Sequence, residues 1–396
     1  MPYTLVFSVF ASALFVLLLK PVAPRVGLVD APCVRKRHDG AIPLIGGLTI
    51  FLAIVLSALL SDQWAAKSGI WMLMLGFPIL VIGMLDDRHD LSPRLRFLIE
   101  IACAVLAAVL FGTCLDSLGA LLPGQVLSLG WLAIPFTVIG MVGVINAFNM
   151  TDGVDGLAGG LAFLIFSALG FLAERVDSSV AFQLWTFSAA ILGFLFFNSR
   201  FFGRAKAAIF MGDAGTLFIG FAIAWYLILL SQGPDAVMQP VTALWLFACP
   251  LLDTVSVMIR RIRRGQSPFS ADREHLHHIF MLAGFGVNGT VLIILAFQLF
   301  FILFGIAMMD LGTPEWISFA TFLGVFVAYF WVMSHAWRVM KRIKQFREWA
   351  GFECRRRHNV ADGRRTGIDR RKEQLPFSGV DRRQGVERRK KSRRGG

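Results

Sequence analysis

The sequence predicts an all-α polytopic integral membrane protein, and three observations carry that prediction. The chain has 396 residues, 56% of them hydrophobic, and its mean hydropathy is +0.66. Apolar runs of about 20 residues, the length that crosses a bilayer as a helix, recur along it. The runs are continuous, unlike the shorter alternating strands of a membrane barrel, and helices satisfy their own backbone groups in lipid. A soluble fold is therefore excluded.

Eleven apolar runs are predicted to span the membrane. The first has no basic residues before it and is followed by Lys20 and Arg25, so we expect a retained span and not a cleaved signal peptide. The predicted spans lie at about 3–19, 42–61, 69–85, 97–116, 131–147, 157–173, 181–197, 207–230, 240–259, 290–309 and 315–336.

The distribution of Lys and Arg gives the orientation. The loops after the odd-numbered spans hold sixteen of these residues, whereas the loops after the even-numbered spans hold only Lys67 and Arg175. Short loops rich in positive charge stay in the cytoplasm. The N-terminus is therefore predicted to lie outside and the C-terminus to be cytoplasmic.

Residues 341–396 are predicted to form a basic cytoplasmic tail, separate from a membrane domain at 1–340. From Arg338 onward the chain holds 21 Lys and Arg against 7 Asp and Glu, so the net charge of +13 resides there. With few apolar residues to bury, the tail is expected to be disordered. It is either a solvated tail that obeys the positive-inside rule or a segment that contacts anionic lipid. Nucleic-acid binding is not expected.

Polar residues gather in four clusters that follow spans three, five, seven and nine. All four are therefore on the predicted cytoplasmic side. Carboxylates are costly at membrane depth and usually mark a functional site there. The shared side predicts that the clusters form one site. They are Asp86-Asp87-Arg88-His89-Asp90, the stretch from Asn146 to Gly160, the stretch from Asn198 to Thr216, and the stretch from Arg260 to His278.

Each cluster also has a purely structural interpretation. The first suits a solvated turn before the next helix, the fourth a solvated loop, and Asp213 suits an N-cap of span eight. A cap explains Asp152 or Asp155, but not both of them together with Asn146 and Asn149. The structural interpretation is therefore weakest for the second cluster.

Asp253 stands apart from the clusters, about seven residues or roughly 10 Å inside span nine. A lone acid at that depth needs a polar partner, and the sequence does not identify it. Taken together, carboxylates, arginines and histidines at the inner leaflet suit Mg²⁺ and phosphate groups. Phosphoryl transfer needs mainly positioning and charge neutralisation from the protein, which such a site would supply.

Residues 1–340 resemble the polyprenyl-phosphate N-acetylhexosamine-1-phosphate transferases. The Arg-x-His-x-His-His form of the last motif is similar to the branch that uses UDP-N-acetylglucosamine. Thr216 stands where the family often has serine, and the tail lies outside the resemblance. The matching motifs are Arg35-Lys-Arg-His38, Gly40, Ile42-Pro-Leu-Ile-Gly-Gly47, the Asp86 cluster, the Asn146 stretch, Phe210-Met-Gly-Asp-Ala-Gly215 and Ser267-Pro-Phe-Ser-Ala-Asp-Arg-Glu-His-Leu-His-His278.

The resemblance implies transfer of N-acetylglucosamine-1-phosphate from UDP-N-acetylglucosamine to undecaprenyl phosphate in a bacterial inner membrane, with release of UMP. This would be the first membrane step of a cell-envelope polysaccharide such as the lipopolysaccharide O-antigen. It implies Asp213 as a ligand of Mg²⁺, with Mn²⁺ as a substitute, and Asp86 and Asp87 as the catalytic pair. The residues implied in substrate binding are Asn149, Asp152, Asp155, Asn198, Arg273, His275, His277 and His278.

Several alternatives stay open. The donor could be another UDP-N-acetylhexosamine, the reaction could pass through a covalent aspartyl phosphate, and the protein could form a homodimer. A secondary transporter is the alternative class, since intramembrane acids such as Asp213 and Asp253 also serve as proton relays. Transporters often show inverted repeats around a midplane site, but this chain shows no repeat and its polar residues gather at one face. A membrane scaffold would leave the four clusters unexplained.

Overall fold

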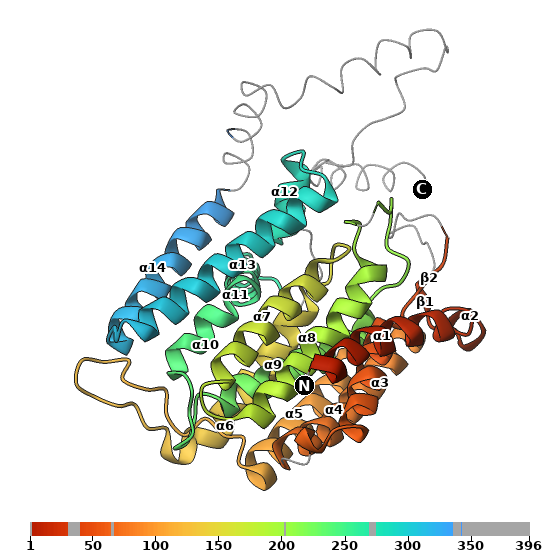
Figure 1. Ribbon diagram of the computed structural model, residues 1–396. Coiled ribbons are helices and arrows are strands. Elements are labelled where there is room, and N and C mark those ends of the chain that lie inside the picture. The colour runs from red at the N-terminus through yellow and green to blue at the C-terminus, as the bar shows by residue number, and fades with distance from the viewer. Residues whose placement is uncertain are drawn as a thin grey trace, which may run out of the picture. The chain divides into compact units, whose positions relative to one another are not determined.

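The computed structural model describes residues 2–30, 40–64, 67–201, 203–268, 275–335 and 342. In these residues helices make up nearly all of the regular structure, as predicted, and the remainder is a short two-stranded sheet. The helices form a bundle in which α1–α5 lie on one side and α13 and α14 lie on the other (Figure 1). The predicted disordered tail at 341–396 lies outside the described residues except for Arg342.

The N-terminal part of the chain, up to Asn149, contains the two strands and the helices that lead to the polar stretch of the second cluster. They are α1 (Pro2–Leu19), α2 (Ala23–Val26), β1 (Val29–Asp30), β2 (Ile42–Pro43), α3 (Gly46–Leu59), the 3₁₀ helix η1 (Asp62–Trp64), α4 (Lys67–His89), α5 (Pro93–Phe111), the 3₁₀ helix η2 (Gly130–Leu132) and α6 (Ala133–Asn149).

In the rest of the chain the described elements are all α-helices. They are α7 (Leu157–Ala173), α8 (Ser178–Asn198), α9 (Gly212–Leu229), α10 (Pro240–Leu246), α11 (Ala248–Arg263), α12 (Leu276–Leu282), α13 (Val287–Asp310) and α14 (Glu315–Ser334).

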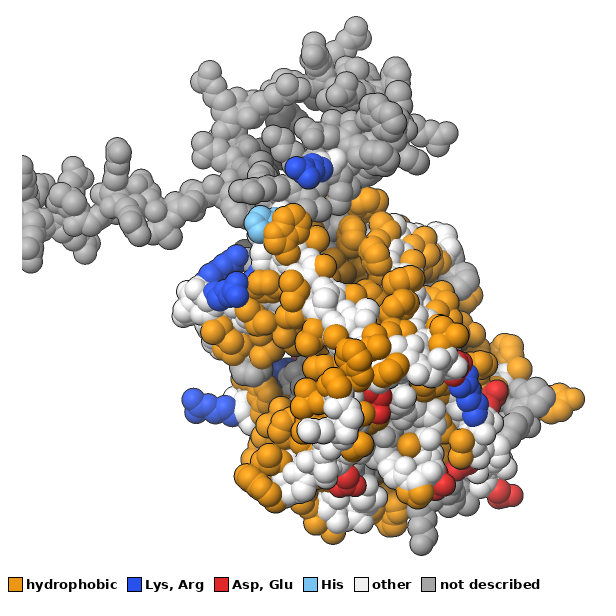
Figure 2. Space-filling view, turned by 90° about the vertical axis from the view of Figure 1, so that its left-hand side faces the viewer, with side chains coloured by type: hydrophobic (Ala, Val, Ile, Leu, Met, Phe, Trp, Pro, Cys, Tyr) orange, Lys and Arg blue, Asp and Glu red, His pale blue; other side chains and the backbone are white. Residues whose placement is uncertain are grey.

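Every predicted span overlaps a helix or, for span nine, a pair of helices. Within the described ranges six helices are long and apolar enough to cross a membrane, and the bent pair α10 and α11 would make a seventh span; α1, α3 and α7 are apolar but shorter. Large apolar side chains stay exposed on α13 and α14, among them Phe300, Leu303, Val327 and Trp331. Figure 2 views that side and shows mostly hydrophobic side chains, as a lipid-facing surface requires. The described chain is a helical, multi-pass membrane protein.

Two predicted spans begin too early. Span two was expected from about residue 42 and span eight from about residue 207, but α3 begins at Gly46 and α9 at Gly212. The apolar residues in between pair two chain segments: the Phe210 amide donates to the Pro43 carbonyl (2.8 Å), and the Gly46 amide donates to the Phe210 carbonyl (2.9 Å). The backbone N–H and C=O groups of these residues therefore form hydrogen bonds between the two segments, and not within a helix.

Span nine is broken. α10 and α11 meet at an angle of 83° around Phe247, whose φ of −112° and ψ of 23° are not helical. Pro250 follows in the first turn of α11, where its missing N–H costs no helical hydrogen bond. The break precedes Asp253, and the residues between Asp253 and the end of span nine lie in the single helix α11, so the expected depth of roughly 10 Å stays a prediction.

The helix α9 forms the centre of the bundle and packs against α3, α4, α6 and α7. Its side chains from Leu217 to Ile228 are all buried. It crosses α4 closely, since a Cβ on Gly83 would lie 2.5 Å from Ala214 Cα. This crossing places the carboxyl end of α4, with its aspartates, beside the first turn of α9.

Candidate active site

Three of the four polar clusters surround a single cavity of about 860 Å³. The expectation of a shared site therefore holds for these clusters, although they come from loops far apart in the sequence. The structure brings seven of the eleven candidate residues to this cavity. They are Asp86, Asp87, Asn149, Asp152, Asp155, Asn198 and Asp213.

The carboxylate of Asp87 binds the start of α9. Its two oxygens accept hydrogen bonds from the backbone N–H groups of Asp213 (2.9 Å) and Ala214 (3.1 Å). Gly212 adopts a φ of 72°, and a Cβ there would lie 2.6 Å from Asp87 Oδ2. Asp87, and not Asp213, therefore accepts the free N–H groups at the N-terminus of α9, where negative charge is favoured. The N-cap interpretation of Asp213 is wrong, because its side chain makes no cap bond.

Arg96 joins two aspartates from different helices. Its Nη1 lies 2.5 Å from Asp86 Oδ2 and 3.2 Å from Asp213 Oδ2. The other oxygen of Asp86 accepts a hydrogen bond from the Leu91 amide (2.7 Å), and Asn149 Nδ2 donates to Asp213 Oδ1 (3.2 Å). A guanidinium between two carboxylates lowers their mutual repulsion.

Arg96 was not singled out from the sequence, where it counted only toward the charge of its loop. Glu100, four residues later on α5, is fully buried and was also missed; its Oε2 accepts a hydrogen bond from Asn146 Nδ2 (2.5 Å). An Arg and a Glu four residues apart in an apolar helix share a face, which is the signal that could have identified them.

The other carboxylates of the DGVDG stretch have different surroundings. Asp152 is exposed to the cavity yet enclosed by protein, and this enclosure, with the charges of Asp213 and Asp155, raises its pKa to about 7. Asp155 instead accepts hydrogen bonds from Arg200 Nε (2.6 Å) and the Ala207 amide (3.0 Å). Asp152 is therefore available to a ligand, whereas Asp155 holds the segment that leads to α9.

Asn198 is 4% exposed and uses both ends of its amide within the protein. Its Oδ1 accepts a hydrogen bond from the Gly156 amide (2.8 Å), and its Nδ2 donates to the Ile209 carbonyl (2.9 Å). It borders the cavity, but these bonds join the start of α7 to the segment before α9.

The histidines of the fourth cluster lie against the second cluster. His277 is 3% exposed, and a Cβ on Gly153 would lie 2.2 Å from its Nε2. Burial, followed by the neighbouring rings of His278 and His275, lowers the pKa of His277 to about 3, so the ring is neutral at pH 7. Gly153 lines the main cavity, which places His277 directly behind it. Arg273 lies outside the described residues.

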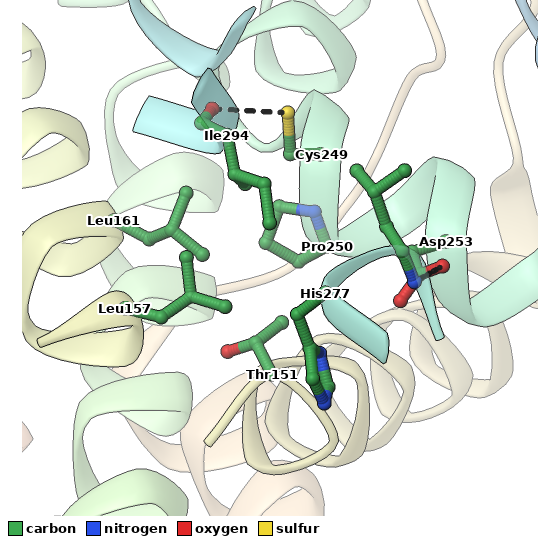
Figure 3. Close-up of a pocket in the computed structure, with 9 residues that line it drawn as sticks. Thr151, Leu157, Leu161, Cys249, Pro250, Asp253, His277 and Ile294 are labelled. Carbon is green, nitrogen blue, oxygen red and sulfur yellow. Dashed lines mark hydrogen bonds between the residues drawn. The ribbon is translucent and has the colours of Figure 1, made fainter. Parts of the chain in front are cut away.

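His277 also lines a second, water-sized cavity of about 20 Å³, together with Thr151 and Asp253 among others. In Figure 3, His277 lies between Thr151 and Asp253. The partner of Asp253 that the sequence did not identify is His275, whose Nδ1 lies 2.8 Å from Asp253 Oδ2.

The cavity suits a divalent metal ion through its donor chemistry. Among the described residues no group of three or more His, Cys, Asp or Glu side chains has the geometry of a metal site. Mg²⁺ does not need one, since it is usually held by one or two carboxylates together with phosphate oxygens and water. The Asp213 side chain is 34% exposed and its two partners lie at 3.2 Å, so its hard oxygen atoms fit such an ion.

This fold and cavity are those of a membrane-embedded transferase: a profile described as glycosyl transferase family 4 matches residues 70–231. The chain is 39% identical to a protein of Escherichia coli O157:H7 over 84% of this chain and 91% of that protein. It is 37% identical to a Yersinia pestis protein (87% and 94%) and 39% identical to a Pasteurella multocida protein (90% and 99%). Each is named undecaprenyl-phosphate alpha-N-acetylglucosaminyl 1-phosphate transferase, and the chain belongs to that family.

Proposed function

We propose that the protein transfers N-acetylglucosamine-1-phosphate from UDP-N-acetylglucosamine to undecaprenyl phosphate. The products are UMP and undecaprenyl-pyrophosphoryl-N-acetylglucosamine, and the reaction would begin a cell-envelope polysaccharide. The observation that carries this proposal is the cavity of about 860 Å³ at the ends of α4, α6 and α9. Its lining includes the carboxylates of Asp86, Asp87, Asp152 and Asp213, and the histidine loop (residues 275–278) lies behind it. The carboxylates that line the cavity suit the phosphosugar transfer that the relatives' name describes.

A phosphate oxygen of the lipid attacks the phosphorus that carries the sugar, and UMP leaves with the electrons of the broken phosphoanhydride bond. The second pKa of a phosphate monoester is about 6, so the lipid phosphate is mostly dianionic at pH 7 and needs no strong base. The protein's task is to position two anionic groups in line and to reduce their repulsion.

Asp86 and Asp87 suit positioning better than covalent catalysis. Both oxygens of Asp87 accept backbone N–H groups of α9, and both oxygens of Asp86 are bound by Arg96 and the Leu91 amide. Attack on phosphorus by either carboxylate would remove negative charge from the oxygens that accept these bonds and so weaken them. Their arrangement supports a single displacement in which the pair fixes the first turn of α9 and the guanidinium of Arg96.

Asp213 is the residue we assign to Mg²⁺, with Mn²⁺ as a substitute. A bound divalent ion would neutralise charge on the pyrophosphate oxygens during transfer. Asn149 and Arg96 hold the Asp213 side chain toward the cavity. We assign Asn149 and Asp152 to the nucleotide side, and the sugar and pyrophosphate to Arg273, His275 and His278. Asp155, Asn198 and His277 hold the walls of the site.

The remaining topology follows from the charge distribution. We propose eleven crossings of a bacterial inner membrane, with the N-terminus outside and both the site and the C-terminus in the cytoplasm. Such a site meets cytoplasmic UDP-N-acetylglucosamine directly. Contact of the basic tail with anionic lipid and a homodimer belong to the same proposal.

The test is transfer in detergent-solubilised membranes. Labelled UDP-N-acetylglucosamine and undecaprenyl phosphate are supplied with and without Mg²⁺, and both label in the lipid phase and UMP are measured. Mg²⁺-dependent transfer with one UMP per sugar supports the proposal. Transfer only from another UDP-N-acetylhexosamine would keep the chemistry and change the donor. No transfer from any donor by a folded protein would overturn the enzyme and restore the transporter interpretation.

A further inference from the structure

Asp253 connects three parts of the chain that are distant in sequence. This buried acid, 6% exposed, lies on α11. Its Oδ1 accepts hydrogen bonds from the Tyr329 hydroxyl (2.8 Å) and the Leu276 amide (3.0 Å), and its Oδ2 lies 2.8 Å from His275 Nδ1. A helix of the broken span, the start of α12 and the C-terminal helix α14 therefore meet at one carboxylate.

These bonds fix the histidine loop at its base. A carboxylate oxygen only accepts, so His275 must donate from Nδ1, which leaves Nε2 as the ring nitrogen that can meet a ligand. The bond to the Leu276 amide sets where α12 begins. Loss of either contact would let the His275 ring turn and the first turn of α12 shift.

The contacts continue from Asp253 to the main cavity. The rings of His275 and His277 stack at 5.8 Å with an angle of 5° between their planes, and His277 packs on Gly153, which lines the cavity. The small cavity of Figure 3 is lined by Asp253 and His277 as well, so the two residues share one packed region. Tyr329 therefore sits at the far end of a continuous series of contacts that reaches the substrate cavity.

We propose that Tyr329 on α14 is a positioning residue of the transferase, acting through Asp253 to hold His275 and the start of α12 in place for the UDP-sugar. The proposal rests on the proposed function for the substrate it names. It assigns a role to a helix outside the segment 70–231 that matches the glycosyl transferase family 4 profile. A positioning residue touches no substrate, so its removal should change substrate binding through the loop alone.

The kinetic test compares Tyr329→Phe with Tyr226→Phe. Both variants lose one hydroxyl; that of Tyr226 donates to Gln183 Oε1 (2.9 Å) between α9 and α8, away from the histidine loop. Loss of one buried hydrogen bond should raise KM for UDP-N-acetylglucosamine about 3- to 10-fold in Tyr329→Phe, with KM for undecaprenyl phosphate unchanged. Tyr226→Phe should change neither. Equal KM values for both variants, or a rise for both substrates together, would overturn the positioning role.

A double-mutant cycle tests through which residue Tyr329 affects KM for the UDP-sugar. If Tyr329 acts through Asp253, Tyr329→Phe should have no further effect on KM in an Asp253→Ala background. A full additional 3- to 10-fold rise in that background would contradict this route.

Hydrogen exchange tests positioning without activity. The segment 275–282 should exchange faster in Tyr329→Phe, and faster still in Asp253→Asn, than in the wild type or Tyr226→Phe. Unchanged exchange in Tyr329→Phe would overturn the inference whatever the assay shows. If exchange is faster in the variant but the wild type transfers no sugar, the positioning contact is supported and only the proposed function is contradicted.

Discussion

The carboxylate half of the site (Asp86, Asp87, Asn149 and Asp213) and the histidine half (Asp253, His275, His277 and Tyr329) are held together by different means. In the first, charged side chains face the cavity, and the backbone of a central helix binds one of them directly. In the second, a single buried carboxylate behind the cavity organises the loop from its far side.

The difference matches the division that we propose between chemistry and substrate recognition. The carboxylate half depends on the close crossing of α4 and α9, which the whole core of the bundle maintains. The histidine half depends on a few hydrogen bonds across a broken span, so it can adjust more easily. Substitutions of the aspartates in the first half should act mainly on kcat and those in the second half mainly on KM for the UDP-sugar, which the following variants test.

The largest effect is expected for Asp213→Asn. The change keeps the size of the side chain but removes the charge that we assign to Mg²⁺, so turnover should fall by at least about 100-fold. Transfer is measured over a Mg²⁺ titration, with Asp310→Asn as the control, since Asp310 pairs with the exposed Arg175 at the other end of α13. Normal turnover by Asp213→Asn would remove this residue from the metal role.

Arg96→Gln should lower kcat about 10- to 100-fold, because charge-assisted hydrogen bonds to both Asp86 and Asp213 are lost. With its fixed cation gone, the carboxylate cluster should attract Mg²⁺ more strongly, so half-maximal activity should need less of it. Arg175→Gln is the matched control. A higher Mg²⁺ requirement in Arg96→Gln would mean that the guanidinium organises the metal ligands more than it competes with the ion.

Gly153→Ala tests the contact between the two halves. The new methyl group would lie 2.2 Å from His277 Nε2, so the ring must move, and kcat/KM for the UDP-sugar should fall about 10-fold. Gly143→Ala on α6 is the control, because nothing lies within 4 Å of its Cβ position. Combining Gly153→Ala with His277→Ala should be no worse than His277→Ala alone; a further loss would place the effect elsewhere.

Asn198→Ala should act on stability and leave KM for either substrate within about 2-fold of wild type. It leaves the Gly156 amide and the Ile209 carbonyl without their partner, at about 2 to 4 kcal/mol in total. Thermal unfolding in detergent measures this, with the exposed Asn288→Ala as the control. A large rise in KM without loss of stability would restore Asn198 as a substrate-binding residue.

The carboxylate half was largely predictable from the sequence. Its residues stand at the ends of apolar runs, and charge parity placed those ends on one side, so a shared cavity followed without any packing information. Which side chains pair did not follow: Arg96 and Asp213 are separated by 117 positions, and their contact depends on how α5 and α9 pack.

The histidine half was less predictable for a physical reason. The apolar run of span nine continues through the break at Phe247. Pro250, whose ring excludes a helical hydrogen bond to the Leu246 carbonyl, is the local signal of that break, but the prediction treated the whole run as one straight helix. Once the helix turns, Asp253 meets Tyr329, 76 positions away, which no local pattern indicates. Backbone pairing at Ile42–Pro43 escaped prediction in the same way, because apolar residues suit a helix and a buried strand equally.

The smallest effect is expected from removing the basic tail after Gln345. No described residue of either half lies beyond Tyr329, so transfer in detergent should stay within about 2-fold of the full chain. In bilayers each basic residue near an anionic surface contributes about 1 kcal/mol, and salt screens this attraction. Activity of both forms is compared in neutral and anionic nanodiscs at low and high salt. Loss of activity in detergent would show that the tail takes part in the site. The carboxylate half and the histidine half would then not account for the whole site.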